Sequence, residues 1–236
     1  MIPNKNTFKT ISAIFIGSIL EWYDFGIFIF LMPIFSGQFF TSTTPYLAPL
    51  FGYCTLAVSY LIRPLGGAIF GYLGDRVSKK QILVITMLLM SFPSLLIGML
   101  PTYTQIGLFA PLTLISLRII QGLSAGGEMI GAIILTYENT PSPLQRPLTN
   151  LVWVGSGLGM LLGSGTVALL LKWMGSESVA IGGWRIPFIV GGILGFFAFY
   201  LRRCLLVNTT SVKAVSYPYS FIQLLEITEQ DRKSVV

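Results

Sequence analysis

A short polar segment between two long apolar runs constrains this chain more than any other feature. Residues 71–81 contain one acidic and three basic side chains: Asp75, Arg76, Lys79 and Lys80. The apolar runs at residues 57–73 and 82–100 can lie in hydrocarbon, but this density of charge cannot. The segment therefore predicts a short loop between two membrane-spanning helices. Because positively charged loops are retained on the cytoplasmic side, it also predicts the direction of both helices.

The composition predicts the same class of protein. Of the 236 residues, 53% are hydrophobic and 10% are charged, and the mean hydropathy is +0.77. Soluble domains carry about a quarter charged residues, so we expect an all-α protein embedded in the lipid bilayer. The net charge of +6 is scattered over loops and ends rather than gathered on one face, which argues against nucleic-acid binding.

The apolar runs divide the chain into six predicted spans. We expect these transmembrane helices at residues 11–35, 47–73, 82–100, 108–136, 151–171 and 186–201. Residues 1–10 would then form a cytoplasmic N-terminus, residues 11–203 the helical bundle, and residues 204–236 a cytoplasmic tail.

The Lys and Arg residues outside these spans are distributed unevenly between the two sides. Most of them, including Arg202 and Arg203 after the last span, fall on the side of the 71–81 segment. Lys172 and Arg185 fall on the other side, in an expected outer loop where Trp184 would lie at headgroup depth. This asymmetry predicts that both termini are cytoplasmic.

Histidine is absent from the sequence. That absence excludes Ser-His and Cys-His catalysis and metal sites that need imidazole. Ser156, which lies between two glycines, has no such base to activate it, and no Gly-x-x-x-x-Gly-Lys-Ser/Thr phosphate-binding loop is present. We therefore expect a protein that is not an enzyme and that holds neither a metal nor a cofactor.

Five ionisable residues lie well inside the predicted spans: Glu21, Asp24, Arg63, Arg118 and Glu128. Each costs about 2.5–3.5 kcal/mol at the centre of a membrane helix, and more without a partner. With a rise of about 1.5 Å per residue, the first four lie about 15–20 Å from an end of their helices and so converge on one depth. Glu128 lies about 15 Å nearer the cytoplasm, where we expect it to meet Arg146 or the 71–81 segment.

These buried charges support two interpretations. In the functional one, a carboxylate such as Asp24 takes up and releases a proton in a central polar cavity while a charged solute binds nearby. In the structural one, Arg63 and Arg118 only neutralise the carboxylates and hold the bundle together.

Glycines recur at four-residue spacing in three of the predicted spans. They lie at Gly67 and Gly71, at Gly122 and Gly126, and at Gly155, Gly159 and Gly163. Because small residues at this spacing let neighbouring helices approach closely, we expect these faces to be packing surfaces.

Several motifs resemble those of the major facilitator superfamily. Residues 71–83 are similar to its signature loop between the second and third helices, although Ser78 stands where that family usually has glycine. Residues 118–122, Arg-Ile-Ile-Gln-Gly, resemble the family's fourth-helix motif, which is implicated in proton coupling. Further stretches resemble the metabolite:proton symporter branch, most of all its proline and glycine-betaine permeases; they lie at residues 21–25, 63–67, 124–128 and 183–188.

The resemblance, which covers residues 7–203, implies one six-helix half of a major-facilitator fold in a bacterial inner membrane. It implies symport of a proton with a small zwitterionic or carboxylate solute, and the fifth span lacks the Gly-Pro pair of antiporters. Asp24 would lie in the coupling and substrate site together with Glu21, Arg63, Arg118 and Glu128. The resemblance also implies a gating loop that latches the two halves on the cytoplasmic side, formed by Gly71, Gly74, Asp75, Arg76, Lys79 and Lys80.

Carriers of this family have two six-helix halves around one cavity, and the resemblance here extends over the first half. We therefore expect that the gene is truncated or split, so that a second half comes from another chain, or that two copies assemble. The solute that the resemblance favours is an osmolyte such as proline or glycine betaine. Two alternatives stay open: a symporter of a carboxylate of the 2-oxoglutarate, citrate or shikimate type, and a membrane remnant that transports nothing.

Overall fold

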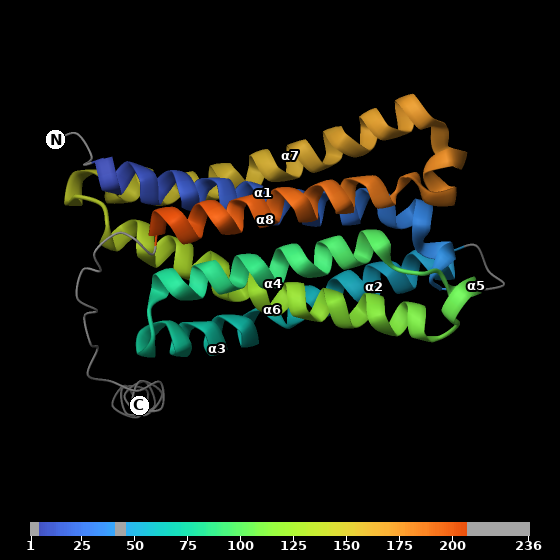
Figure 1. Cartoon of the computed structure of the whole chain (residues 1–236), viewed down its shortest axis with the longest axis horizontal. Coiled ribbons are helices and arrows are strands. Elements are labelled where there is room, and N and C mark those ends of the chain that lie inside the picture. Colours follow the sequence, from blue (N-terminus) through green and yellow to red (C-terminus); the bar gives the residue numbers. More distant parts are fainter. Residues whose placement is uncertain (1–4, 41–45, 207–236) are drawn as a thin grey trace, which may run out of the picture.

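The computed structural model describes residues 5–40 and 46–206, which form helices joined by short connections (Figure 1). In chain order the elements are α1 (Lys5–Phe35), η1 (Ser36–Gln38), α2 (Leu47–Leu61), α3 (Arg63–Arg76), α4 (Lys79–Met99), α5 (Tyr103–Ile106), α6 (Phe109–Glu138), η2 (Ser142–Leu144), α7 (Gln145–Ser178), η3 (Val179–Gly183) and α8 (Arg185–Leu206). Six helical stretches among them are long and apolar enough to cross a membrane. The predicted all-α membrane protein with six spans is confirmed.

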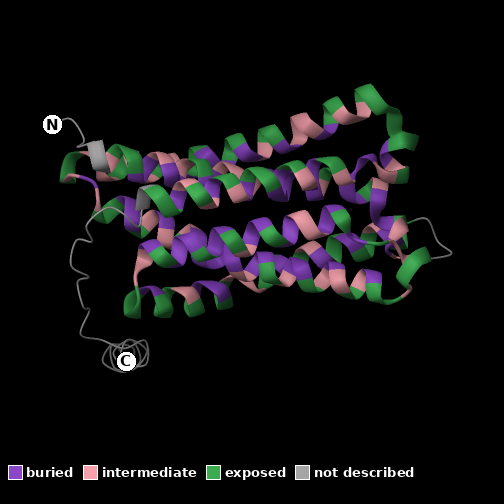
Figure 2. Ribbon diagram, in the orientation of Figure 1, coloured by how far each residue is buried: buried purple, intermediate pink, exposed green. Residues whose placement is uncertain are grey.

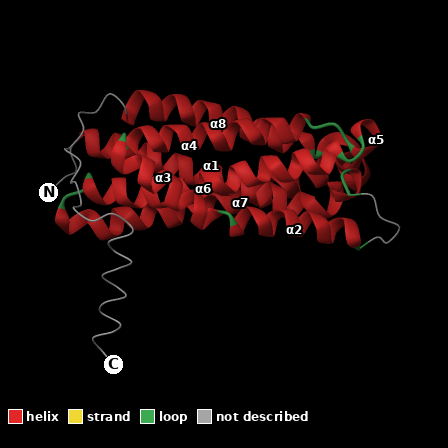
Figure 3. Ribbon diagram, turned by 90° about the horizontal axis from the view of Figure 1, so that it is seen from below, coloured by secondary structure: helices red, strands yellow, loops and turns green. Residues whose placement is uncertain are grey.

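The helices run roughly along one direction in two groups. Figure 1 shows α1, α7 and α8 on one side and α2, α3, α4 and α6 on the other. In the turned view, α1 and α6 lie between α8 and α4 at one edge and α7 and α2 at the other (Figure 3). In agreement with both views, α1 packs against α7 and α8, and α6 packs against α2, α3 and α4. The two helices that carry most of the predicted site charges are therefore the central ones.

The two ends of the bundle differ in what they carry. The start of α1 and the end of α8 lie at the same end as the connection between α3 and α4, which we call the α3–α4 end (Figure 1). The short helix α5 lies at the opposite end, which we call the α5 end. The start of α1 and the end of α8 lie at the same end of the bundle because the number of spans is even.

Most helices extend beyond the spans predicted from hydropathy. α1 begins at Lys5, within the expected N-terminal segment, and α8 continues to Leu206 rather than ending at residue 201. Hydropathy marks the part of a helix that can lie in hydrocarbon, whereas backbone hydrogen bonds continue through polar residues beyond it. Residues 1–4 and 207–236, which include most of the predicted tail, lie outside the described residues.

The second predicted span, residues 47–73, is divided into two helices. α2 ends at Leu61 and α3 begins at Arg63, with Pro64 at its second position. Because proline has no backbone N–H, Pro64 cannot donate the helical hydrogen bond to the residue four positions earlier. The neighbouring bonds persist, since the N–H of Ile62 donates to Val58 (3.1 Å) and that of Gly66 to Ile62 (3.1 Å). The span is interrupted where Arg63 enters the protein interior.

Most of the 71–81 segment is helical rather than a loop. α3 runs through Arg76 and α4 starts at Lys79, so only Val77 and Ser78 connect them. Ser78 has an extended backbone, which separates the two helices. Charged side chains can continue a helix once it leaves the hydrocarbon, because the helix satisfies its own backbone groups. The expected turn between the two spans is correct, but it is shorter than expected.

The predicted outer loop at residues 172–185 is also largely helical. α7 runs from Gln145 to Ser178 rather than from 151 to 171, and a π-helical turn, η3, follows it. Gly175 has φ +75°, a conformation that side-chain-bearing residues rarely adopt, so the chain changes direction there without a long loop. Figure 1 shows the resulting turn from α7 into α8 at the α5 end.

Trp184 lies in the protein interior and does not face the surroundings of the bundle. Its side chain is fully buried, and its ring stacks on Phe35 with the ring centroids 4.7 Å apart. Phe39 and Phe188 pack around the same ring edge-on. The indole N–H donates to the Gln38 side-chain oxygen (3.1 Å), so the one polar atom of Trp184 needs no water. An aromatic cluster at the α5 end therefore replaces the expected interfacial anchor.

Glycines allow the outer helices α2 and α7 to pack closely against the central helices. A Cβ added to Gly122 would meet the backbone of Ser59, and one added to Gly159 would meet the backbone of Ile19, so at both crossings the helices touch through their main chains. Gly71 does not belong to such a contact, because nothing lies within 4 Å of its Cβ position. The outward faces of α3 and α7 are exposed and largely apolar, as expected for lipid-facing or partner-facing surfaces (Figure 2).

Candidate functional site

Asp24, on the central helix α1, is the most heavily coordinated side chain of the predicted site. It is 3% exposed, and its carboxylate accepts hydrogen bonds from Arg118 (3.1 Å) and Gln121 (3.1 Å) on α6. Ser94 on α4 donates a short hydrogen bond to the other carboxylate oxygen. The carboxylate is thus held from two neighbouring helices, and both of its oxygens have donors.

Arg118 completes this arrangement from α6. It is fully buried, and its guanidinium lies over the Phe28 ring, 3.3 Å from the centroid. Only Nη1 bonds Asp24, and the buried Nε and Nη2 have no hydrogen-bond partner within the described residues. A guanidinium between a carboxylate and an aromatic face is stabilised by its interactions with both, but two donor atoms of Arg118 stay without a hydrogen bond in the described part of the chain. We call Asp24, Arg118, Gln121 and Ser94 the Asp24 network.

Glu21 lies one helical turn from Asp24 on α1 and faces a second arginine. Its Oε1 is 3.8 Å from Nη2 of Arg63, which is within ion-pair range but too long for a hydrogen bond. Neither Glu21 Oε1 nor the Nε and Nη2 of Arg63 has a hydrogen-bond partner within the described residues, although all three atoms are buried. The pair is therefore much looser than the one between Asp24 and Arg118.

Three aromatic rings surround the Arg63 guanidinium. Its central carbon lies 4.2 Å from the Phe25 centroid, 4.3 Å from that of Tyr60 and 5.5 Å from that of Trp22. These distances are in the range of cation–π interactions, which stabilise a cation without satisfying its N–H groups. Trp22 and Phe25 belong to the 21–25 stretch that resembles the family, and Tyr60 lies three residues before Arg63. We call Arg63, Glu21 and the three rings the Arg63 cage.

Glu128 does not meet the partners that its position predicted. Its Oε1 lies 2.8 Å from Nη2 of Arg202, and the two side chains are 1% and 0% exposed. Arg146 instead lies at the exposed start of α7. The expectation of Arg146 or the 71–81 segment is wrong, because α8 continues far enough to bring Arg202 inside the bundle.

Arg202 is the functional candidate that sequence reasoning missed. Hydropathy placed it among the solvated cytoplasmic cations together with Arg203, but Arg202 is buried whereas Arg203 is exposed. One signal was available: Arg202 follows Gly191, Gly195 and Ala198 at helical spacing on the buried stripe of α8. Ser94 was missed as well, since a serine in an apolar helix gives no sign of its partner.

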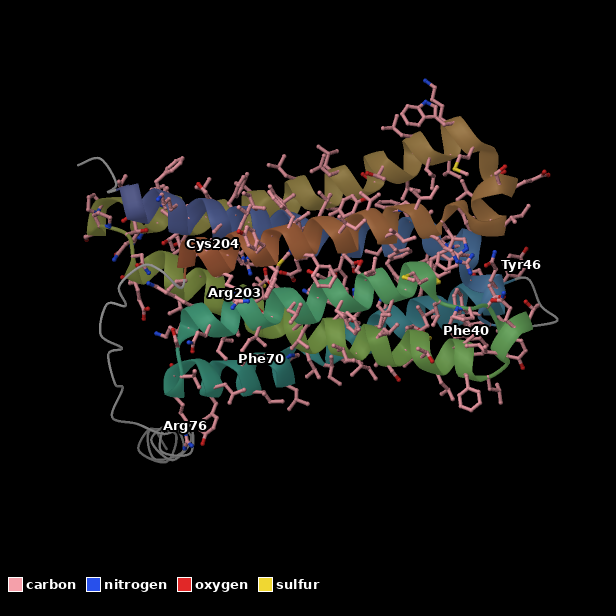
Figure 4. All side chains as sticks on the ribbon, viewed as in Figure 1. Phe40, Tyr46, Phe70, Arg76, Arg203 and Cys204 are labelled. Atoms are coloured by element: carbon pink, nitrogen blue, oxygen red, sulfur yellow. The ribbon has the colours of Figure 1, made fainter. Side chains whose placement is uncertain are left out.

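The predicted gating residues lie apart from this site, at the α3–α4 end. Lys79 forms an ion pair with Glu138 at the end of α6, and Gly74 and Lys80 are buried. Asp75 and Arg76 are exposed, and the Arg76 guanidinium lies 4.3 Å from the Tyr72 centroid. Figure 4 shows Arg76 on the last turn of α3, pointing away from the bundle. Within residues 5–40 and 46–206, Asp75 forms no ion pair.

The sequence profile of the Major Facilitator Superfamily matches residues 14–224. The chain belongs to this superfamily. A Staphylococcus aureus (strain COL) protein provisionally named as a proline/betaine transporter is 38% identical over 204 residues, 86% of this chain and 44% of its own. The shikimate transporter of Escherichia coli (strain K12) is 39% identical over 190 residues, 80% of this chain and 43% of its own. The proline/betaine transporter of Salmonella typhimurium is 38% identical over 197 residues, 84% of this chain and 39% of its own.

Solved structures of the superfamily share the fold. The inward-open xylose transporter XylE from E. coli superposes with a TM-score of 0.73 at 15% identity, over 96% of this chain and 56% of that one. A D-xylose-proton symporter gives a TM-score of 0.69 at 16% identity, over 97% and 52%. At this identity the likeness concerns the fold alone. The chain spans less than half the length of the curated relatives it matches, and it corresponds to one half of the major-facilitator fold.

Membership of the superfamily agrees with the expected class of protein. The chain is a homologue of membrane transporters and not an enzyme, as its sequence predicted. In the part of the chain that the structure describes, no group of three or more His, Cys, Asp or Glu residues could hold a metal ion.

Proposed function

We propose that the chain forms one six-helix half of a proton-coupled symporter for a small osmolyte such as proline or glycine betaine. Relatives at 38% identity carry the names of proline/betaine transporters, which supports the osmolyte. The proposed location is a bacterial inner membrane with the α3–α4 end, and hence both termini, in the cytoplasm. A second half from another chain, or a second copy of this one, completes the transport path.

The observation that carries the proposed substrate is the Arg63 cage. Buried donors of Arg63 lack partners, so they can bind a carboxylate, while the Trp22 and Tyr60 rings and Glu21 can face a cation. A zwitterion such as proline or glycine betaine carries both charges within a few bonds. The cage therefore offers one group for each end of such a solute.

The proposed coupling residue is Asp24. As a carboxylate it holds Arg118 and Gln121; a proton on it removes the charge that Arg118 pairs with. Protonation then loosens α1 from α6, beside the cage, which links proton uptake to solute binding. Glu128 contributes a further negative charge below Glu21, with which it interacts electrostatically.

A carboxylate metabolite is the second candidate solute. The relative named as a shikimate transporter is as similar to this chain as the proline/betaine transporters are. Arg118 also has unpaired buried donors, so two guanidinium groups near Phe25 could bind an anion. A carboxylate metabolite needs no cation site. The effect of removing an aromatic ring on binding therefore distinguishes the two candidate solutes.

Uptake into proteoliposomes tests the proposed function. The chain is reconstituted alone or together with a separately expressed second half from a proline/betaine relative, and an inward proton gradient is applied. We expect labelled glycine betaine or proline to accumulate in at least one preparation, and labelled shikimate not to compete. Accumulation of shikimate instead supports the second candidate, and no accumulation in either preparation supports a non-transporting remnant.

The proposed orientation has a separate test. A reporter that is active only in the cytoplasm should be active when fused after Val236 and inactive when fused after Ser178, which lies at the α5 end. The reverse pattern would invert the proposed topology.

A further inference from the structure

Arg202 lies where a charge is least expected, inside the bundle near the α3–α4 end. It comes from the last turns of α8 and is fully buried, although Arg203 and Cys204 beside it are exposed. Figure 4 shows Arg203 and Cys204 on these turns, at the same end of the bundle as Arg76. The contacts of the Arg202 guanidinium explain its burial.

Every nitrogen of that guanidinium has an acceptor. Nη2 bonds the Glu128 carboxylate on α6 (2.8 Å) and lies 3.5 Å from the carbonyl of Ile14 on α1. Nε bonds the Ala13 carbonyl, also on α1 (3.2 Å), and Nη1 bonds the Leu83 carbonyl on α4 (3.0 Å). One planar side chain therefore connects α8 to three other helices.

Gly17 provides the space for this guanidinium. A Cβ added to Gly17 would overlap the guanidinium atoms of Arg202, so any side chain there would displace it. Gly17 is one turn after Ala13 on α1, and its missing side chain leaves the α1 backbone open to Arg202. The sequence therefore provides both the cation, Arg202, and the space that receives it at Gly17, which we call the Gly17 cradle.

The buried Glu128 carboxylate pairs with Arg202. The carboxylate is 1% exposed, its Oε2 has no hydrogen-bond partner within the described part of the chain, and Arg202 is its ion-pair partner. A second carboxylate, that of Glu21 on α1, interacts with Glu128 electrostatically, and Arg63 of α3 lies beyond Glu21. Without Arg202, a buried negative charge would face a second carboxylate.

We propose that Arg202 is the counter-ion of Glu128 inside the bundle and the positioning residue that fastens α8 to α1, α4 and α6. This inference concerns the folded bundle and does not require that the chain transports a solute. It predicts a specific asymmetry: removing Arg202 alone leaves an uncompensated buried charge, whereas removing both charges together does not.

The test compares melting temperatures of the purified full chain in detergent at pH 7.5. We expect Arg202→Met to lower the melting temperature by roughly 6–20 °C, the range for breaking a buried pair in a chain of this size. Glu128→Gln added to Arg202→Met should restore most of the loss at pH 7.5, and Arg203→Met should change nothing.

A second pair of variants tests the cradle with a change of one methyl group. Gly17→Ala should lower the melting temperature, whereas Gly157→Ala should not, because nothing lies within 4 Å of the Gly157 Cβ position. If Arg202→Met does not accumulate in the membrane, accumulation of the double variant replaces the melting temperature as the measure of rescue. Equal losses for Arg202→Met and Arg203→Met, or no rescue by Glu128→Gln in either measure, would overturn the proposal.

Discussion

The Asp24 network and the Arg63 cage each pair a carboxylate of α1 with an arginine, yet they are built differently. The Asp24 carboxylate has donors on both oxygens and pairs with Arg118 at 3.1 Å. Glu21 and Arg63 lie 3.8 Å apart, and neither Glu21 Oε1 nor two of the Arg63 nitrogens has a partner within the described residues. Two buried nitrogens of Arg118 also lack a partner within the described part of the chain, so the difference lies in the carboxylates. A carboxylate with donors on both oxygens loses several contacts when its charge changes, whereas Glu21 and Arg63 keep atoms free for a ligand. We therefore assign coupling to the first and solute recognition to the second.

Removal of the titratable group from the Asp24 network should have the largest effect on transport. Asp24→Asn keeps the shape and polarity of the side chain but cannot take up a proton, so proton-driven accumulation should fall to the level of empty vesicles. Glu21→Gln, one turn away, should reduce uptake less, because Glu21 is expected to contact solute rather than to carry the proton. The measurement is uptake of labelled betaine after a pH jump. Asp24→Asn vesicles that still concentrate betaine would remove Asp24 from the coupling role.

Replacing Arg118 or Arg63 with a neutral residue should affect different properties: thermal stability for Arg118 and solute binding for Arg63. Arg118→Gln leaves the buried Asp24 carboxylate without its cation and should lower the melting temperature by roughly 6–20 °C. Arg63→Gln breaks a long ion pair and three cation–π contacts but no hydrogen bond to Glu21, so it should lower the melting temperature less than Arg118→Gln and weaken betaine binding by about 10–100-fold. Melting curves and equilibrium binding on the same preparations give both values. If Arg63→Gln proved as destabilising as Arg118→Gln, the two sites would not differ in the way described.

The aromatic part of the Arg63 cage should give a smaller and more selective effect. Trp22→Leu removes one ring beside the cation site and should weaken glycine betaine binding by roughly 2–30-fold, the range of a cation–π contact. Any residual binding of shikimate, which has no cation, should be unaffected. Trp153→Leu is the matched control, because Trp153 is exposed on α7. An equal loss of affinity for ligands with and without a cation would indicate a packing role for Trp22.

The gating segment lies outside both sites, and its effect should be the smallest. Asp75 is exposed and forms no ion pair within the described residues, so Asp75→Asn should leave membrane insertion and melting temperature unchanged. In a preparation completed by a second half, the same variant should lower the uptake rate severalfold, because the proposed latch at the α3–α4 end loses its anion. An unchanged uptake rate would indicate that this segment determines only the orientation of the helices in the membrane.

Much of this arrangement could be predicted from the sequence because depth in a membrane helix follows from counting residues. Asp24 and Arg118 were expected at one depth on different helices, and they meet. Which arginine pairs with which carboxylate depends on the rotation of each helix about its axis, and the apolar composition gives little information on that rotation. Arg202 was missed for a related reason: hydropathy places a cation at the membrane edge, whereas Gly17 and Glu128 make room for it inside. The burial of Trp184 was missed because its contacts with Gln38 and three phenylalanines do not follow from hydropathy.

The pH dependence of solute affinity tests the central claim most directly. If a proton on Asp24 opens the pair with Arg118 and favours solute binding, then glycine betaine affinity of the transport-competent preparation must rise as the pH falls. In Asp24→Asn the affinity should be independent of pH, since that side chain cannot titrate. Binding isotherms measured between pH 5 and pH 8 on both proteins provide the comparison. A parent affinity that does not change with pH, or an Asp24→Asn variant with the same pH dependence as the parent, would contradict the account.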